Sequence, residues 1–426
     1  MASIWLFLLP ALLLLGLLGQ ARYSAALVLL SALLPAYVLR LTVVGVPTNA
    51  LELAIITVTL TGVIQPAVRR RWRYALARLP RLPALLIALL LFAVLASALL
   101  SPHPRPSWGI VKGWVVVPLI FGWQVFAATF RPRTRRRVTA ALLASSVAMA
   151  LLGLSQVIAV PRGRGIYDVP NSLAIFLTPL TVIAWWQTKR LVALILAAGL
   201  LATQSASALA AVLVTLALGF AVWPQRLTRS ALASLVILAV LAASYLAATG
   251  RIAYFIRPWF SQNHSSITVR LQLWSIAIAL VREHPLRGLG LGVFEPAYQQ
   301  KLHDRFARYN SGRQPAKPLA EFVFRDPHNW VLSFWLNTGL LGLASFAGLN
   351  FWLLRCAMRR ARDHLSQALT LALISLLIIG LADTIYWKND LAALHWLLLA
   401  LLLHQGRANR VENKPGQYCN NDSENS

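Results

Sequence analysis

The sequence is poor in charge, in acids and in cysteine. Only 12% of its 426 residues are charged, with 13 Asp and Glu against 40 Lys and Arg, where a soluble protein carries about 25%. Its two cysteines, Cys356 and Cys419, have no nearby partner and no CxxC spacing, so we expect neither a disulfide nor a zinc site. No phosphate-binding glycine loop, GxSxG elbow, HExxH or DxD-like pair is present. We therefore expect neither a metal nor a cofactor.

Long apolar runs take the place of the missing charge. The chain is 58% hydrophobic, and its repeated apolar runs of roughly 17–22 residues are long enough to cross a bilayer as helices. This pattern predicts an all-α polytopic membrane protein with about 12–13 transmembrane helices. The candidate spans are 3–19, 24–40, 48–65, 83–100, 109–130, 138–160, 171–187, 191–204, 206–223, 231–249, 329–354, 366–386 and 391–404.

The net charge of +27 follows from topology rather than from nucleic-acid binding. Basic residues cluster in four short loops that span counting puts on one side, and the positive-inside rule makes that side cytoplasmic. The loops between them, 101–108 and 161–171, carry less charge and fall outside. No basic domain interleaved with aromatic residues is present, so we expect no nucleic-acid partner. The four basic loops are 69–81, 131–137, 224–229 and 355–363.

These spans divide the chain into four parts. Residues 1–249 hold the N-terminal membrane helices, and 250–328 form one large outer loop that we expect to cap the active site. Residues 329–404 hold the C-terminal membrane helices, and 405–426 form a polar tail that we expect to be disordered and cytoplasmic. No internal repeat is visible.

Short helices are expected inside the large loop. The stretch 265–285 has apolar residues at helical spacing, with Ser265 or Ser266 as a cap and Pro285 after its end. A glycine-rich turn, 286–294, and a short polar helix, 298–310, follow. The predicted apolar face of the first helix comprises Ile267, Leu271, Trp274, Ile278 and Val281.

Several polar residues lie at the predicted outer side of the membrane. Lys112 stands one turn inside a span, where it either extends to the interface or binds an anion. Arg162 and Arg164 flank glycine in a loop that continues through Asp168 and Asn171. Paired guanidinium groups are suited to a ligand that bears phosphate, although an ordinary loop and helix start would also explain this stretch.

His328 is the residue hardest to explain by structure alone. Asp326 is a good helix N-cap and Pro327 a good first helical residue, whereas nothing in spanning a membrane requires His328 or Asn329. The helix dipole disfavours an imidazolium at this position. A neutral imidazole there could accept a proton near neutral pH.

Three further charged residues have open assignments. Arg270 lies on the predicted loop helix, where contact with solvent or lipid headgroups is the simpler explanation. Asp383 is placed near the outer end of the span 366–386, with Lys388 as a possible ion-pair partner. Glu52, in the third span, has no obvious neighbour.

Three stretches carry a resemblance to a known family. They are "RGRGIYDVPNSLAIFLTPL" (162–180), "VRLQLWSIAIALVREHPLRGLGLGVF" (269–294) and "DPHNWVLSFWLNTGLLGL" (326–343). In this order and on one side of the membrane, they resemble the bacterial O-antigen ligase family, within the wider superfamily of O-antigen ligases and polymerases. The likeness covers roughly residues 80–400. Many members carry a Ser-Arg pair near the middle, where this chain has Ser205 to Ala208 without arginine.

The resemblance implies a metal-independent membrane glycosyltransferase of the bacterial inner membrane, multi-pass, with its active site facing the periplasm. Such an enzyme transfers a preassembled glycan from undecaprenyl diphosphate to a sugar hydroxyl of lipid A–core. We expect His328 to act as the base, Arg270, Arg164 and Lys112 to bind the diphosphate, and Arg162 to be in reserve. The supporting residues are Asp326, Asn329, Asp383, Asp168 and Asn171.

Other activities remain compatible with the sequence. A polymerase or a protein O-oligosaccharyltransferase would use the same chemistry on another acceptor. A lipid-linked glycan flippase would instead show inverted repeats, broken helices and ionisable groups near the midplane of the membrane.

Overall fold

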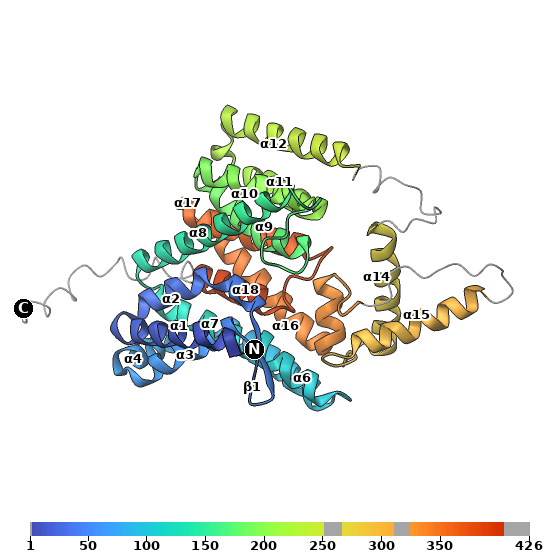
Figure 1. Cartoon of the computed structure of the whole chain (residues 1–426), viewed down its shortest axis with the longest axis horizontal. Helices are drawn as coiled ribbons and strands as arrows, with labels where there is room; N and C mark the ends of the chain where they lie inside the picture. Colours follow the sequence, from blue (N-terminus) through green and yellow to red (C-terminus); the bar gives the residue numbers. More distant parts are fainter. Residues whose placement is uncertain (1, 251–265, 311–323, 404–426) are drawn as a thin grey trace, which may run out of the picture.

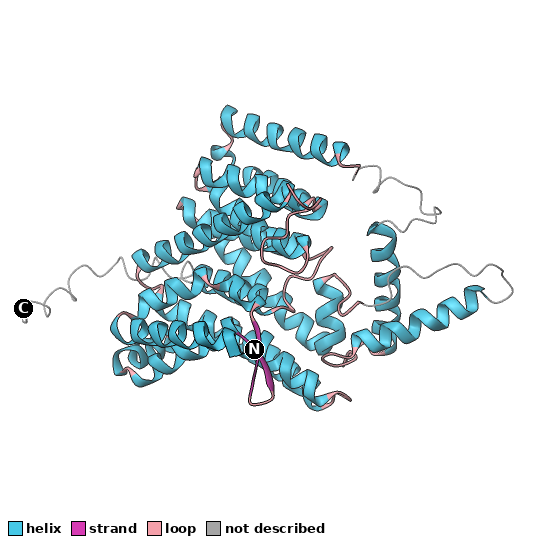
Figure 2. Ribbon diagram, viewed as in Figure 1, coloured by secondary structure: helices cyan, strands magenta, loops and turns pink. Residues whose placement is uncertain are grey.

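A computed structural model describes residues 2–250, 266–310 and 324–403, and the described part is almost entirely helical (Figures 1 and 2). This confirms the prediction of an all-α polytopic membrane protein. The helices are α1 (Ala2–Ala21), α2 (Tyr23–Ala32), α3 (Ala50–Ile64), α4 (Pro66–Ala77), α5 (Arg81–Leu99), α6 (Pro104–Ile110), α7 (Val117–Ala128), α8 (Pro132–Gln156), α9 (Pro170–Trp186), α10 (Arg190–Thr203), α11 (Ala206–Val222), α12 (Arg229–Ala248), α14 (Ser266–Glu283), α15 (Phe294–Asn310), α16 (Trp330–Arg360), α17 (His364–Ile379) and α18 (Asn389–Leu403).

Fewer helices than predicted are long enough to cross a bilayer by themselves. Within the described residues, four stretches pass by length and apolar composition, or five if the pair α3 and α4, bent by 99°, forms one span. Twelve of the thirteen predicted spans coincide with helices, but several are short. The α10 helix has 14 residues and measures about 21 Å, less than the hydrocarbon thickness of about 30 Å. The four stretches are Arg81–Leu99, Pro104–Ala128, Pro132–Gln156 and Trp330–Arg360.

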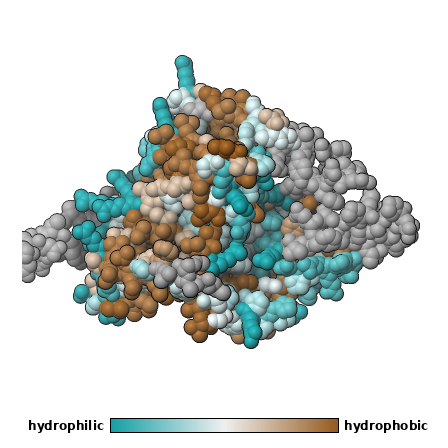
Figure 3. Space-filling view, in the orientation of Figure 1, coloured by the Kyte–Doolittle hydropathy of each residue, from teal (hydrophilic) through white to brown (hydrophobic). Residues whose placement is uncertain are grey.

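The outer surface is apolar, as contact with lipid requires. Large side chains such as Phe7, Leu13, Phe92 and Phe351 are each at least 64% exposed. Figure 3 shows apolar residues covering broad parts of the visible face, with polar residues gathered in smaller areas. A soluble monomer rarely exposes apolar patches of this extent. The chain is thus a multi-pass membrane protein.

The predicted span 24–40 is wrong. The α2 helix stops at Ala32, a short 3-10 turn follows, and strands β1 (Arg40–Val43) and β2 (Val46–Asn49) form an antiparallel hairpin. Val44 and Gly45 at its tip have φ of +49° and +76°, as a two-residue hairpin turn requires. Pro35 and the β-branched run Thr42–Val44 explain why the apolar stretch did not continue as a helix.

The α9, α17 and α18 helices form the centre of the helical part. Most of their side chains are buried by neighbouring elements. The first residues of α9, α16 and α18 and the last residue of α17 carry the loops that meet at the candidate site. Packing of the central helices therefore fixes where those loops lie.

The large loop contributes α14 and α15, seen at the right of Figure 1. Its first helix was predicted at the correct place, but the buried face differs from the prediction. Of the predicted face, Val281 is buried as expected, but Ile278 is 41% exposed and Trp274 is half-buried, and a neighbouring stripe packs against α15 and α16. Because α14 carries apolar residues on all of its sides, their spacing in the sequence does not identify the face that is buried. The buried stripe comprises Leu273, Ile276, Ala277 and Leu280.

Some predictions fall on residues outside the described part. They are the cap Ser265, the segments 251–265 and 311–323, and the tail 404–426.

A glycine turn from the loop docks into a break in α16. Gly339 interrupts this helix with φ of +69°. The amide of Leu340 there donates to the carbonyl of Leu286 at 2.9 Å, and the amide of Leu289 donates to the carbonyl of Leu336 at 2.7 Å. A Cβ at Gly288 would lie 2.5 Å from the Leu336 carbonyl oxygen. The glycines therefore allow two backbones to approach within hydrogen-bonding distance.

Candidate functional site

His328 stands in the loop just before α16, held in an unusual backbone conformation. Its φ is +50°, a left-handed value that is uncommon for residues other than glycine. Its amide donates to Asp326 Oδ1 at 2.9 Å. The prediction of Asp326 as N-cap and Pro327 as first helical residue is wrong. Asn329 is the cap, and its Oδ1 accepts from the amides of Val331 at 3.0 Å and Leu332 at 3.2 Å.

Asp383 lies against His328 at the centre of the site. It occupies the loop between α17 and α18, not the span in which we had placed it. Its Oδ1 is 3.2 Å from His328 Nδ1, and its Oδ2 is 3.8 Å from Arg270 Nη2. The proposed pairing with Lys388 is wrong, since Lys388 Nζ donates to Ser172 Oγ at 2.9 Å. Asp383 is only 5% exposed, so its partners are the side chains that surround it.

The charges of this group stabilise one another. Burial alone would raise the pKa of Asp383, but the hydrogen bond and charge of His328, with the charge of Arg270, lower it to about 2. Burial alone would lower the pKa of His328, but the hydrogen bond and charge of Asp383, with Asp326 beyond, raise it above its ordinary value. The two carboxylates therefore oppose the helix dipole, which disfavours an imidazolium at this position.

Thr384 and Ser333, which no sequence pattern singles out, complete the polar group around His328. The Thr384 hydroxyl donates to Asp326 Oδ1 at 2.8 Å and lies 3.3 Å from His328 Nδ1. The Ser333 hydroxyl donates to the other oxygen of Asp326. Burial raises the pKa of Asp326 in spite of these contacts. Thr384 could have been found as the neighbour of Asp383, and Ser333 as one turn beyond Asn329.

Arg270 brings the loop helix α14 to the site. Its Nε donates to the carbonyl of Ala382 at 2.7 Å, beside its ion pair with Asp383. One turn later, Trp274 Nε1 donates to the carbonyl of Pro327 at 3.1 Å. The helix therefore contacts both loops that carry the charged pair.

The loop 161–171 reaches the same centre through one amide. Asn171 Nδ2 donates to Asp383 Oδ2 at 3.2 Å, and Arg162 Nη2 donates to Asn171 Oδ1 at 2.8 Å. Arg162 Nε also donates to the carbonyl of Thr203 at 2.8 Å, at the boundary between α10 and α11. That boundary is where the family resemblance leads us to expect an arginine that this chain lacks.

Arg164 and Asp168 lie on the exposed side of the same loop. Arg164 is exposed and contacts the carbonyl of Asp168 at 3.5 Å. The Asp168 carboxylate forms an exposed ion pair of 2.6 Å with Arg40 of the hairpin. Neither has a contact with His328 among those that the structure describes.

Lys112 forms a second charged group near the start of α18. Its Nζ lies 2.7 Å from the Oε2 of Glu52, which is 5% exposed, and donates to the carbonyl of Pro47 at 2.6 Å. Asn389, the first residue of α18, donates to Glu52 Oε1 at 2.6 Å. Glu52 therefore does have a neighbour, and the charge of Lys112 is compensated in this structure.

The arrangement can perform acid–base chemistry. With Asp383 ionised and bound to Nδ1, the imidazole holds its proton on that nitrogen when neutral, which leaves Nε2 as the acceptor. Positive charge from Arg270 stands beside it. Among residues 2–250, 266–310 and 324–403, no group of three His, Cys, Asp or Glu is arranged to hold a metal ion.

The fold and this site define a multi-pass membrane protein with a His–Asp–Arg centre where helix ends meet a loop domain. Residues 191–347 match the model of the family described as O-Antigen ligase. This confirms the resemblance to the O-antigen ligase family over that part of the chain. The matched region runs from α10 into α16, so it contains Arg270 and His328 but not Asp383. A search of curated proteins gives no match.

Proposed function

We propose that the protein is an O-antigen ligase that transfers a preassembled glycan from undecaprenyl diphosphate to a sugar hydroxyl of lipid A–core, at the periplasmic face of the inner membrane. The family match over residues 191–347 supports a membrane glycosyltransferase of the O-antigen ligase or polymerase type. The donor, the acceptor and the side of the membrane belong to the proposal. The main observation in its favour is that the buried carboxylate of Asp383 forms ion pairs with both His328 and Arg270.

In the proposed reaction, His328 Nε2 takes the proton of the acceptor hydroxyl. The hydroxyl oxygen attacks the anomeric carbon of the donor sugar, and the bond from that carbon to the diphosphate oxygen breaks. The leaving diphosphate keeps the electron pair. Asp383 stabilises the imidazolium that forms, as an aspartate does in a catalytic dyad.

We propose Arg270 as the main contact for the diphosphate of the donor. Its side chain is 17% exposed and lies beside Asp383. A phosphate would therefore bind to an arginine that is already paired with a carboxylate. A guanidinium group can donate to carboxylate and phosphate together, because it carries five N–H groups. We propose Arg162 and Arg164 as further contacts from the neighbouring loop. Lys112 would require release from Glu52 to take part.

The apolar surface around the site is compatible with a polyprenyl donor. On α16, which begins beside His328, the apolar side chains of Leu340, Leu341 and Phe351 are 41%, 40% and 68% exposed. Apolar tails could therefore reach the reacting diphosphate without leaving the bilayer. A flippase is less well supported, because the break at Gly339 in the long helix α16 is filled by the backbone of the glycine turn.

The full-length protein, reconstituted in liposomes with a glycan on undecaprenyl diphosphate, tests the proposal. Lipid A–core and a second lipid-linked glycan are offered together as acceptors. A ligase gives glycan attached to lipid A–core and releases undecaprenyl diphosphate. Extension of the second lipid-linked glycan would instead identify a polymerase, and translocation without transfer a transporter.

A further inference from the structure

A cavity lined by arginines lies at the end of the membrane part opposite to His328. Its volume is about 400 Å³, and its walls come from α4 and from the junction between α7 and α8. This size falls in the usual range for small-ligand sites, about 300–1,000 Å³. The lining residues are Arg70, Arg71, Tyr74, Ala127, Ala128, Phe130 and Arg131.

The position of the cavity follows from the direction of two helices. Glu52 and Lys112 form their ion pair near the start of α3 and before α7, close to the first residue of α18. The α3 helix then runs to Ile64 and α7 to Ala128, where the cavity lies. The stretch from Pro104 to Ala128 is long enough to cross a bilayer. The two sites are therefore separated by the length of a span.

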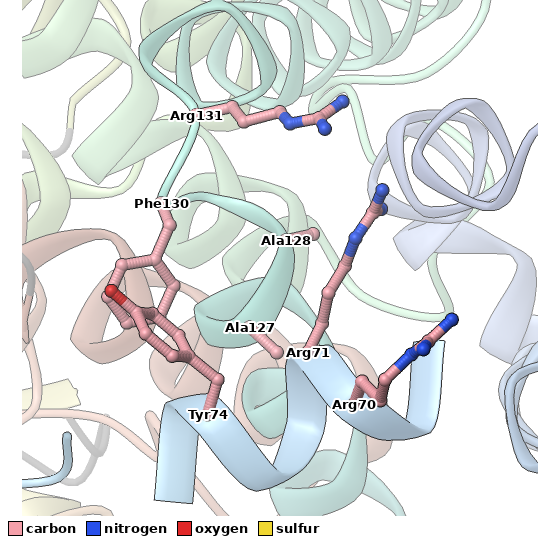
Figure 4. A pocket seen from close by; sticks show the side chains of 7 residues that line it. All are labelled: Arg70, Arg71, Tyr74, Ala127, Ala128, Phe130 and Arg131. Carbon is pink, nitrogen blue, oxygen red and sulfur yellow. The ribbon is translucent and has the colours of Figure 1, made fainter. Parts of the chain in front are cut away.

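Three guanidinium groups surround the cavity without a carboxylate. Figure 4 shows Arg71 and Arg131 extending toward the same side, with Arg70 beside them. Within the described residues, no hydrogen bond or ion pair is found for the side chains of these three arginines. All three side chains are exposed, so their positive charge is available to a ligand. This arrangement favours a ligand with negative charge.

The remaining walls are apolar and aromatic. Ala127 and Ala128 are buried, and the rings of Tyr74 and Phe130 meet edge to face at 5.4 Å. The guanidinium carbon of Arg78 lies 4.5 Å over the Tyr74 ring. A free phosphate ion has no apolar atoms to bury against these walls, whereas the glycerol and upper acyl carbons of a lipid would contact them.

The α4 helix lies where lipid headgroups are expected. It is bent 99° from α3, and its buried residues are Val68 and Ala75 while its arginines are exposed. A helix with one apolar side and a basic polar side typically lies in the interface plane. Basic pockets between spans are suited to anionic headgroups.

We propose that this cavity binds the phosphate headgroup of an anionic phospholipid, with Arg70, Arg71 and Arg131 around the phosphate and Tyr74 and Phe130 against the glycerol backbone. The lipid would fix α4 against the end of α7. This site is independent of the glycan transfer proposed above, so either could fail without the other.

The test measures binding of phosphatidylglycerol to the purified full-length protein in neutral detergent, by native mass spectrometry. The variant Arg70→Gln/Arg71→Gln/Arg131→Gln should bind the lipid roughly tenfold or more weakly. The control Arg133→Gln/Arg136→Gln/Arg137→Gln removes the same charge from exposed positions of α8 and should change affinity less than about threefold. The single variant Arg71→Gln should show a smaller loss in the same direction.

Three results would overturn the proposal. Unchanged lipid affinity in the cavity variant would show that the cavity does not bind the lipid. Equal losses of affinity in both triple variants would show that the lipid responds only to the general positive charge of the surface. Displacement of the lipid by excess inorganic phosphate or glycerol 1-phosphate would identify a soluble phosphate ligand instead of a lipid.

Discussion

At the scale of single residues, the site depends on how one histidine is held. His328 takes a left-handed backbone conformation, and Asp383 contacts its Nδ1. Strain of this kind costs on the order of 1–3 kcal/mol and persists where surrounding contacts compensate it. The neighbouring cap Asn329 and the contact of Asp326 with the His328 amide provide such contacts.

Replacing His328 by alanine should lower the transfer rate by roughly 100- to 10,000-fold, the usual contribution of a general base. The measurement is glycan transfer in reconstituted liposomes at equal protein content. His303→Ala removes an exposed histidine of α15 and should leave the rate unchanged. Full activity of His328→Ala would exclude the proposed base.

The rate of transfer should depend on pH through His328. The neutral imidazole is the active form, and its pKa is raised above the ordinary value. Activity should therefore fall as pH decreases through that raised pKa and recover as pH increases beyond it. Asp383→Asn removes the negative charge that helps to raise the pKa of His328, so it should lower the rate and shift the acidic limb to lower pH. An unshifted limb would show that Asp383 does not act through the histidine.

At the scale of elements, α14 connects the large loop to the site. Arg270 and Trp274, one turn apart, donate to Ala382 and Pro327 on two different loops. The helix has its own small core with α15 and the first half of α16. Its position is therefore set by packing, and its arginine by hydrogen bonds.

Arg270→Ala should raise the KM for the lipid-linked donor and reduce transfer, because a charge-assisted contact to the diphosphate is lost. A loss of at least about tenfold in kcat/KM is expected, since such hydrogen bonds contribute about 1.5–3 kcal/mol. Arg282→Ala, at the exposed end of the same helix, is the matched control. Unchanged donor kinetics would make Arg270 a purely structural residue.

The break in α16 should be intolerant of a side chain. A Cβ at Gly339 would lie 2.3 Å from the carbonyl oxygen of Leu286, and the φ of +69° disfavours any other residue. Gly339→Ala should therefore lower the thermal unfolding temperature in detergent by several degrees or more. Gly348→Ala places its Cβ 3.4 Å from Leu86 in ordinary helix and should be tolerated. Equal decreases in unfolding temperature for the two variants would show that the break at Gly339 is no less tolerant of a side chain than the ordinary helix.

At the scale of the whole molecule, three charged groups are divided between the two ends of the spans. The His328 centre and the Lys112–Glu52 pair belong to one end, and the arginine cavity to the other. This separation agrees with the basic loops that the sequence places together.

Labelling of single cysteines tests the orientation. In a chain without Cys356 and Cys419, Val44→Cys stands at the hairpin tip, where Val44 is 97% exposed, and Arg133→Cys stands at the start of α8. An impermeant maleimide should label the first in intact spheroplasts and the second only after permeabilisation. The reverse pattern would place His328 on the cytoplasmic side.

The sequence predicted the helices well because apolar runs and turn residues are local signals. Lys112, Arg270 and Asp383 were recognised as unusual charges, but their partners were not, since Glu52 pairs across 60 positions and Asp383 across 113. The hairpin was missed because its apolar residues resemble a span. The role of Asn329 was missed because Asp-Pro is the stronger local helix-start signal.

The contact between the glycine turn of the loop and the break in α16 has a consequence for biogenesis. In the bilayer, an amide without a partner costs several kcal/mol, and the amide of Leu340 finds its partner in Leu286. Because the turn is synthesised before α16, its backbone is available when that helix enters the membrane. Insertion of this late helix should thus wait for earlier translocation of the loop, and a chain with the turn deleted should expose α16 to quality-control proteolysis.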